Sequence, residues 1–454
     1  MENLLSKITV VIALLVLIFV LFDDKKDYLS YSFILIVIAG LATMVDVILS
    51  EENSWIDEYI DGIDWEVIVF LICMFTIVEI LQEEKIFDFI ALSIVKRYQS
   101  QIRMMFYVIC IVSTFSATII EDLSVSIIFC PIIIIACKKL DISPTPFLLG
   151  MTVCVNLAAT LTPFGSAQNI MITNAYDVSV LEFILQFGVY FLVSTSLTLF
   201  ILDRTVLQVQ IDQKKLQSMD SAPLTFTESE LFLFENQAFK RKFIKNMLGI
   251  GLFIVLLLAI HEIYLAGILG LIVFMLLNPV TDKEGKKRLK LSHYLSKVDY
   301  TLIYFFICLY LLIHLMELNG LIQNIELFLI EVSFHNIFIL ALFILLLTSI
   351  MSGLIDNAPV TIMFLPIIRI LIKQAGFPLE PLLIAFVLGI NVGGNFLPQG
   401  SAADMMTLEM AKKYDVSDLN YKKLAKVGGG FALLHVILGV LYLVFIIYVY
   451  PTFP

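Results

Sequence analysis

Three acidic residues of this sequence stand inside long apolar runs. Glu121 and Asp122 are neighbours in one run, and Asp356 lies in another. An ionisable side chain at membrane depth is costly and usually marks the path of an ion or a substrate. Asp122 and Asp356 also resemble N-caps of a following helix. A cap needs only one small polar group, so capping does not explain the additional acid Glu121. We therefore predict that these carboxylates bind a cargo or exchange protons.

Two other segments combine proline with small residues, 162–168 (TPFGSAQ) and 397–403 (LPQGSAA). Irregular backbone at membrane depth persists only where protein or a water-filled cavity satisfies it, so paired interruptions indicate a binding site. Simple proline kinks are the alternative. Helix N-termini at the breaks suit an anion, whereas carboxylates and freed carbonyls suit Na⁺ or H⁺.

Asparagines and glycines flank these breaks, and they provide amide ligands and close backbone approach. In the second copy Asp404 replaces Asn169. The predicted ion- or substrate-binding residues are Glu121, Asp122, Ser124, Asn156, Thr162, Gly165, Ser166, Asn169, Asp356, Asn357, Thr361, Asn391, Gly393, Gly400, Ser401 and Asp404.

Glu79 and His314 are candidates for a proton relay, with a place near the lipid headgroups as the alternative. The six cysteines all lie in apolar stretches without metal-ligand spacing, so we interpret them as small core residues. Neither HExxH nor GxSxG occurs. We expect no metal, no cofactor and no enzymatic activity.

The elements that position these residues must lie in lipid. The chain has 454 residues, of which 60% are hydrophobic and 15% charged, too apolar for one water-soluble core. Apolar runs long enough to cross a bilayer recur along the chain. We predict a multi-pass protein of the cell membrane whose partners are lipid and a small ion or anionic substrate, with no nucleic acid.

The chain also repeats itself. Residues 64–173 match 299–408 without a gap, at a constant offset of 235, and the shared residues include prolines, asparagines, glycines and serines. Asp64 pairs with Asp299 and Asn156 with Asn391. We predict a first repeat at 1–203, a linker at 204–245 and a second repeat at 246–454.

Each repeat is predicted to be all-α, with five crossings, a re-entrant hairpin and an interrupted helix. The five crossings of each repeat are four continuous helices and the interrupted helix. The continuous crossings are 8–22, 29–49, 65–82 and 180–203 in the first repeat and 246–260, 263–278, 300–316 and 428–450 in the second. The interrupted helices are 145–175 and 380–410, and the hairpins are 103–138 and 338–373.

An odd number of crossings inverts the second repeat, and charge supports this. Lys and Arg are absent from Asp27 to Glu84 and frequent just after it, whereas in the second repeat they precede the matching crossing. The linker 204–245 and the loop 279–298 are therefore expected in the cytoplasm. Arg369 and Lys373 are then predicted on the non-cytoplasmic side of the membrane, which is an exception to this rule.

At these motifs the chain resembles the ion transporter superfamily, in particular its branch of arsenite/antimonite permeases, NhaD-type Na⁺/H⁺ antiporters and the melanosomal P protein. The resemblance rests on 63–81, on the tips IEDLSVSIIFCPI and LIDNAPVTIMFLPI, and on the loops TPFGSAQNIMI and NVGGNFLPQGSAADMM. It implies that tips and loops of both repeats line one central site, which alternating access moves across the membrane. It also allows a homodimer.

We accordingly expect a secondary transporter that exchanges arsenite, antimonite or Na⁺ for protons, with H⁺ or Na⁺ as the coupling ion. The alternative is a Na⁺-coupled symporter of di- or tricarboxylates, and a passive channel is the weaker third reading. The chain has no GxxxxGK[ST] motif, so ATP could act only through a separate subunit.

Overall fold

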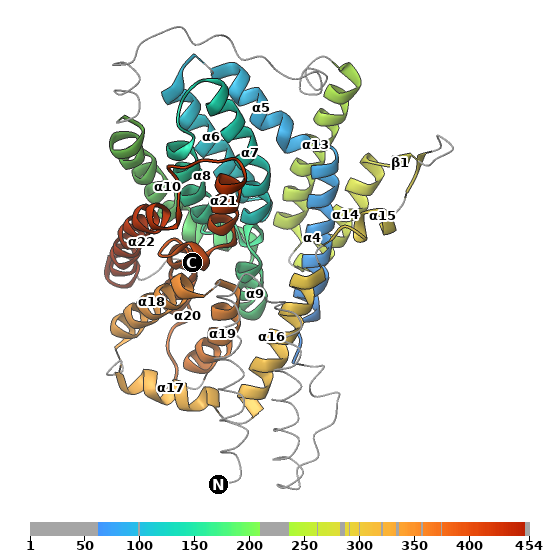
Figure 1. Cartoon of the computed structure of the whole chain (residues 1–454). Coiled ribbons are helices and arrows are strands. Elements are labelled where there is room, and N and C mark those ends of the chain that lie inside the picture. The colour runs from blue at the N-terminus through green and yellow to red at the C-terminus, as the bar shows by residue number, and fades with distance from the viewer. Residues whose placement is uncertain are drawn as a thin grey trace.

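A computed structural model of the chain (Figure 1) describes residues 62–98, 100–208, 236–260, 262–281, 287–289, 291–298, 300–318, 321–332, 336–355, 357–373 and 375–449. The predicted crossings 8–22 and 29–49 and the acidic residue Asp356 lie outside these ranges.

The described part of the first repeat is helical throughout. Its elements are α4 (Trp65–Glu83), α5 (Ile86–Tyr98), α6 (Ile102–Ala117), α7 (Asp122–Lys139), α8 (Thr145–Ala158), the 3₁₀ turn η1 (Pro163–Gly165), α9 (Ala167–Tyr176), α10 (Val180–Leu202) and the π-helical turn η2 (Asp203–Leu207). Asp64 caps α4 by accepting a hydrogen bond from the Val67 amide over 3.2 Å, and a capping box of Ser179 and Glu182 starts α10.

The second repeat follows the same order. It contains α13 (Gln237–Ala259), α14 (Ile263–Leu277), the strands β1 (Val280–Thr281) and β2 (Lys287–Arg288), α15 (Leu291–Leu295), α16 (Tyr300–Leu318), α17 (Leu321–Val332), α18 (Ile337–Leu354), α19 (Asn357–Lys373), α20 (Leu379–Gly393), η3 (Pro398–Gly400), α21 (Ala402–Lys413), α22 (Tyr421–Val444) and η4 (Phe445–Val449). The antiparallel pair β1 and β2 is the single β feature of the described residues.

The structure confirms the all-α fold of two inverted repeats. Six elements of the second repeat begin 235 residues after their counterparts: α16, α17, α18, α19, η3 and α21 follow α4, α5, α6, α7, η1 and α9. In Figure 1 the hairpin of α6 and α7 occupies the upper part of the molecule, whereas α18 and α19 lie at the lower end. The two hairpins therefore enter from opposite ends and place their tips toward the centre.

Several boundaries differ from the sequence-based expectation. The short helices α5 and α17 precede the hairpins, and the expected elements did not include them. Helix α22 begins at Tyr421, before the predicted start at 428, because Asn420 caps it. Helical structure also continues past 203 through η2 and resumes at Gln237, so it takes up both ends of the expected linker.

Five described helical segments are long and apolar enough to cross a membrane: Trp65–Glu83, Val180–Leu207, Gln237–Ala259, Ile337–Leu354 and Tyr421–Val449. Helices α10 and α13 expose leucines and valines along one side, including Leu185, Val189 and Leu248. Such a surface is stable in lipid but not in water. The chain is therefore a multi-pass membrane protein.

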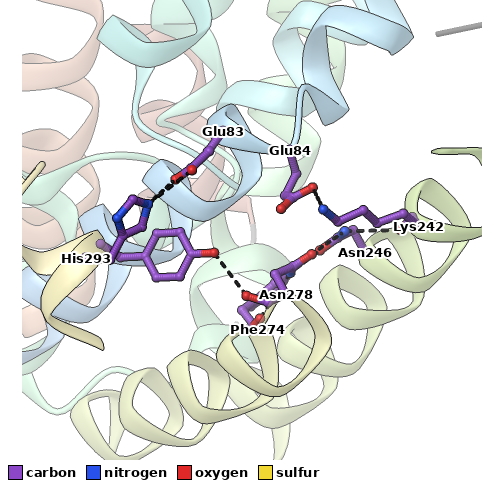
Figure 2. A network of polar contacts seen from close by, with 8 residues as sticks. Glu83, Glu84, Lys242, Asn246, Phe274, Asn278 and His293 are labelled. Carbon is purple, nitrogen blue, oxygen red and sulfur yellow. Dashed lines mark hydrogen bonds and ion pairs between the residues drawn. The ribbon is translucent and has the colours of Figure 1, made fainter. Parts of the chain in front are cut away.

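Polar contacts join the C-terminal end of α4 to the second repeat (Figure 2). Glu84 forms an ion pair with Lys242 of α13. Glu83 accepts a hydrogen bond from Lys297 over 2.8 Å and lies 3.0 Å from a ring nitrogen of His293. Lys297, one of the basic residues that set the expected side of loop 279–298, thus also attaches that loop to α4.

A buried amide pair extends this network between α13 and α14. Asn246 and Asn278 each donate to the other's side-chain oxygen, over 3.0 and 2.7 Å (Figure 2). The hydroxyl of Tyr294 donates to the carbonyl of Asn278 over 3.0 Å. Burial, with the nearby charges of Glu83 and Glu84, raises the pKa of Tyr294 to about 12, so this hydroxyl remains a donor.

Candidate functional site

The two interruptions have the same backbone conformation. Thr162 and Leu397 are extended, with φ and ψ of −131° and 148° and of −134° and 147°; a proline then opens the 3₁₀ turn, and Ser166 and Ser401 return to extended backbone. Because proline donates no hydrogen bond and suits a helical first position, it ends the preceding helix and starts the turn. Both interrupted helices predicted from the sequence are present.

Each hairpin tip packs directly on the interruption of its own repeat. A Cβ added at Gly165 would lie 2.6 Å from the Ala117 carbonyl oxygen, and one at Gly400 would lie 2.6 Å from that of Ser352. Residues 117 and 352 occupy matched positions, and glycine is required at both contacts because any side chain would displace the tip. Gly393 likewise lies against the backbone of Ser349.

Hydroxyl groups attach the tips at these contacts. Thr162 donates to the Thr118 carbonyl over 2.6 Å in the first repeat. In the second, Ser352 donates to the Ile390 carbonyl over 2.6 Å. The tips and interruptions of each repeat thus form one polar centre.

The two centres meet where the interrupted helices of the repeats cross. Asn156 of α8 donates to the Asp404 carboxylate over 3.2 Å, and the matched Asn391 of α20 donates to the Asn169 side-chain oxygen over 2.9 Å. Each contact joins one repeat to the other. The structure therefore brings together these four residues, which the sequence predicted separately.

Further buried polar residues complete the crossing. Asn156 also donates to Asn395 over 2.8 Å and accepts from Ser401 over 2.9 Å. Gln168 donates to Asn391 over 3.3 Å. When the Asn357 amide takes the orientation that its own neighbours favour, its oxygen also accepts from Gln168 over 3.2 Å. All six side chains are buried.

Asp404 is the most enclosed of the described acids of this site, with 1% of its surface exposed. Thr152 lies one helical turn before Asn156 on α8, and its hydroxyl donates to Oδ1 of Asp404 over 2.5 Å. Thr407, one turn after Asp404, donates to Thr152 over 3.4 Å. No Lys, Arg or His pairs with Asp404 among the residues that the structure describes.

The acids of the first tip are more exposed. Glu121, Asp122 and Ser124 are half-buried. Helix α7 begins at Asp122, so the cap position belongs to Glu121, whose side chain makes no capping hydrogen bond, and Asp122 accepts instead from the Leu123 amide over 2.7 Å. Asp122 is not the N-cap, but it lies close enough to Asp404 for a like-charge interaction.

Among the residues described, two of the predicted residues make no hydrogen bond to the other repeat. Thr361 donates to the carbonyl of Asn357 within α19, over 2.9 Å. The hydroxyl of Ser166 is buried and has no hydrogen-bond partner among the described residues.

Glu79 and His314 lie away from the crossing. Glu79 is one turn before Glu83 on α4 and interacts electrostatically with Lys297. His314 of α16 lines a cavity of about 270 Å³ together with Asp64, Tyr310 and Arg369. The cavity lies between α4, α16 and α19, at the end of the molecule from which the second hairpin enters.

Four residues of the crossing were not predicted from the sequence: Thr152, Gln168, Asn395 and Thr407. Thr152 and Thr407 carry a usable signal, since each lies one helical turn from a predicted residue on the same face. Gln168 and Asn395 belong to the interrupted segments themselves, where any buried amide is a candidate.

Paired interruptions, two inverted hairpins and a buried polar crossing are typical of membrane transporters. The sequence profile of the citrate transporter family (CitMHS) matches residues 13–390 and 253–453, and the chain belongs to this family. The expected membership of the ion transporter superfamily is confirmed.

The chain is similar to two mycobacterial proteins over most of its length and to the P protein over a shorter segment. It is 23% identical over 386 residues to a 46 kDa membrane protein of Mycobacterium leprae, covering 82% of this chain and 84% of the relative. An uncharacterized transporter of Mycobacterium tuberculosis is 21% identical over 387 residues, covering 84% and 86%. The human P protein is 20% identical over 137 residues, which are 30% of this chain and 16% of that protein.

The fold is also similar to a solved structure. The YdaH transporter of Alcanivorax borkumensis superimposes with a TM-score of 0.59 at 13% identity, covering 85% of this chain and 86% of that one. This likeness supports the architecture alone.

Proposed function

We propose that this transporter moves a small di- or tricarboxylate across the membrane together with a cation. The observation that carries the proposal is the crossing itself, where buried amides and hydroxyls of both repeats surround Asp404. A binding site shared between inverted repeats changes its exposure when one part of the molecule moves against the other. The family description, citrate transporter, indicates the class of solute.

The cation is required by the charges of the site. No Lys or Arg occurs at 115–126, 156–170, 350–362 or 391–405, while acidic residues are present. A carboxylate normally needs a cationic or donor-rich partner. Amides, hydroxyls and the N-terminal ends of α7 and α19 supply donors, and a bound cation balances the acidic side chains.

The same absence of Lys and Arg favours a second candidate, the exchange of arsenite, antimonite or Na⁺ for protons. In that case the acidic residues carry cargo and proton in turn, and no anion site is needed.

Uptake by proteoliposomes separates the two candidates. The purified protein is reconstituted with an internal pH dye, and labelled citrate or succinate is added with an inward Na⁺ gradient, an inward proton gradient or no gradient. Gradient-driven accumulation of either label is the expected result. If neither label enters, and arsenite, antimonite or Na⁺ instead drives protons across the membrane, the exchange mechanism replaces the symport.

A further inference from the structure

One difference between the repeats lies directly in the crossing contacts, where an asparagine of the first repeat is matched by an aspartate of the second. Asn169 and Asp404 occupy matched positions, 235 residues apart, and each accepts a hydrogen bond from the asparagine of the other repeat. The Asn169 side chain then uses its nitrogen, which donates to the Ala159 carbonyl over 2.5 Å. In Asp404 that nitrogen is replaced by an oxygen, which has no proton to donate unless the carboxyl is protonated.

The hydrogen bonds of Asp404 show the consequence. Among the described residues, both donors to this carboxylate, Thr152 and Asn156, reach Oδ1. Oδ2 therefore accepts no hydrogen bond from the described residues, whereas the matched nitrogen of Asn169 has the Ala159 carbonyl as its partner. A largely buried carboxylate that lacks a donor at one oxygen is stabilised by a proton or a bound cation.

Among the residues that the structure describes, none around Asp404 supplies a cation. Helix α7, which packs on α21, brings the like charge of Asp122 and the thiol of Cys130, which contacts Thr407 over 3.6 Å. Its Lys138 donates instead to the Tyr414 carbonyl, beyond the end of α21. Helix α8 contributes no Asp, Glu, Lys, Arg or His. A bare carboxylate buried in this way is strongly unfavourable, whereas a proton or a bound ion removes the cost.

We propose that Asp404 is the coupling site of the transporter and that a monovalent cation, H⁺ or Na⁺, binds at its Oδ2. The inference rests on the proposed function and assigns its cation to one carboxylate.

Asp404→Asn is the informative substitution, since the first repeat shows that asparagine fits this position and bonds to the facing asparagine. Asp177→Asn is the matched control: Asp177 is an exposed residue with a left-handed backbone (φ 56°), which asparagine also adopts. Full-length protein is purified in detergent, and its melting temperature is measured across a NaCl series balanced with choline chloride and across a pH series.

Wild type and Asp177→Asn should be stabilised by Na⁺ if the cation is sodium, or by lower pH alone if it is a proton. Asp404→Asn should lose that response. In proteoliposomes net uptake by Asp404→Asn should no longer respond to either gradient, whereas Asp177→Asn should keep the wild-type response.

A melting temperature of Asp404→Asn that still follows the same cation, or uptake that still follows its gradient, would overturn the assignment to Asp404. Failure of the proposed function looks different, because wild type itself would then transport no carboxylate under any gradient. The melting series needs no transported substrate and therefore tests the cation site in either case.

Discussion

The side-chain nitrogen of Asn156, in the first repeat, lies 3.2 Å from the carboxylate of Asp404, in the second. Its counterpart Asn391 lies 2.9 Å from Asn169, so the inverted repeats are joined by two equivalent contacts. Each interrupted helix is thereby held by the interruption of the other repeat. The site depends on both halves of the chain.

We expect Asn156→Ala and Asn391→Ala each to lower transport at least tenfold. Each change leaves a buried acceptor unpaired, at a cost of about 1–3 kcal/mol. Solute uptake and thermal unfolding are measured on the same preparations, with Asn336→Asp as a control at an exposed helix cap, where aspartate caps equally well. Unchanged uptake in both alanine variants would show that the crossing has no part in transport.

Gly165→Ala and Gly400→Ala should both destabilise the protein, by about 1–3 kcal/mol, and reduce transport, because the new methyl group meets the backbone of the hairpin tip. Gly251→Ala is the control, since nothing lies within 4 Å of a Cβ at that position in α13. It should leave the protein as stable as wild type or stabilise it slightly. The three melting temperatures give the comparison, and equal losses at all three glycines would contradict it.

The side of the membrane on which Arg369 is accessible tests the proposed orientation of the protein. The cavity places Arg369 at the same end as Asp64, and Ser143 donates to Asp418 over 2.6 Å, which joins two loops at the other end. All six native cysteines are buried and free, so a new exposed cysteine can be labelled selectively.

In intact cells, an impermeant thiol reagent should label Arg369→Cys rapidly. It should label Lys422→Cys, an exposed residue at the start of α22, only after permeabilisation. The opposite pattern would reverse the proposed sides and place the linker 204–245 outside.

The amide pair of Asn246 and Asn278 should behave as a coupled unit. Either single change to leucine leaves a buried amide with lost partners and should destabilise by about 1–3 kcal/mol, whereas the double leucine variant should lose less than the sum. A double-mutant cycle on the unfolding free energy measures the difference. Strict additivity would mean that the two side chains do not stabilise each other.

The inverted repeat was predictable from the sequence because rare residues recur at a fixed offset, and the structure keeps that offset in α4 and α16. Helices α5 and α17 were missed because they are short and lie next to the hairpins, where apolar runs merge. The sequence identified Asn156 and Asp404 as candidates but not as a pair. Their contact spans 248 positions and depends on how two interrupted helices cross, which local patterns do not encode.

The correspondence between the repeats is incomplete, and this affects how the transporter works. Two identical halves would make the inward-facing and outward-facing states equal in free energy at zero gradient. Here Asp404 faces Asn156 where Asn169 faces Asn391, and Thr152 has Val387 as its counterpart. With the cation assigned above to Asp404, we expect the two resting states to differ in free energy and in their response to that cation. We then also expect unequal transport rates in the two directions.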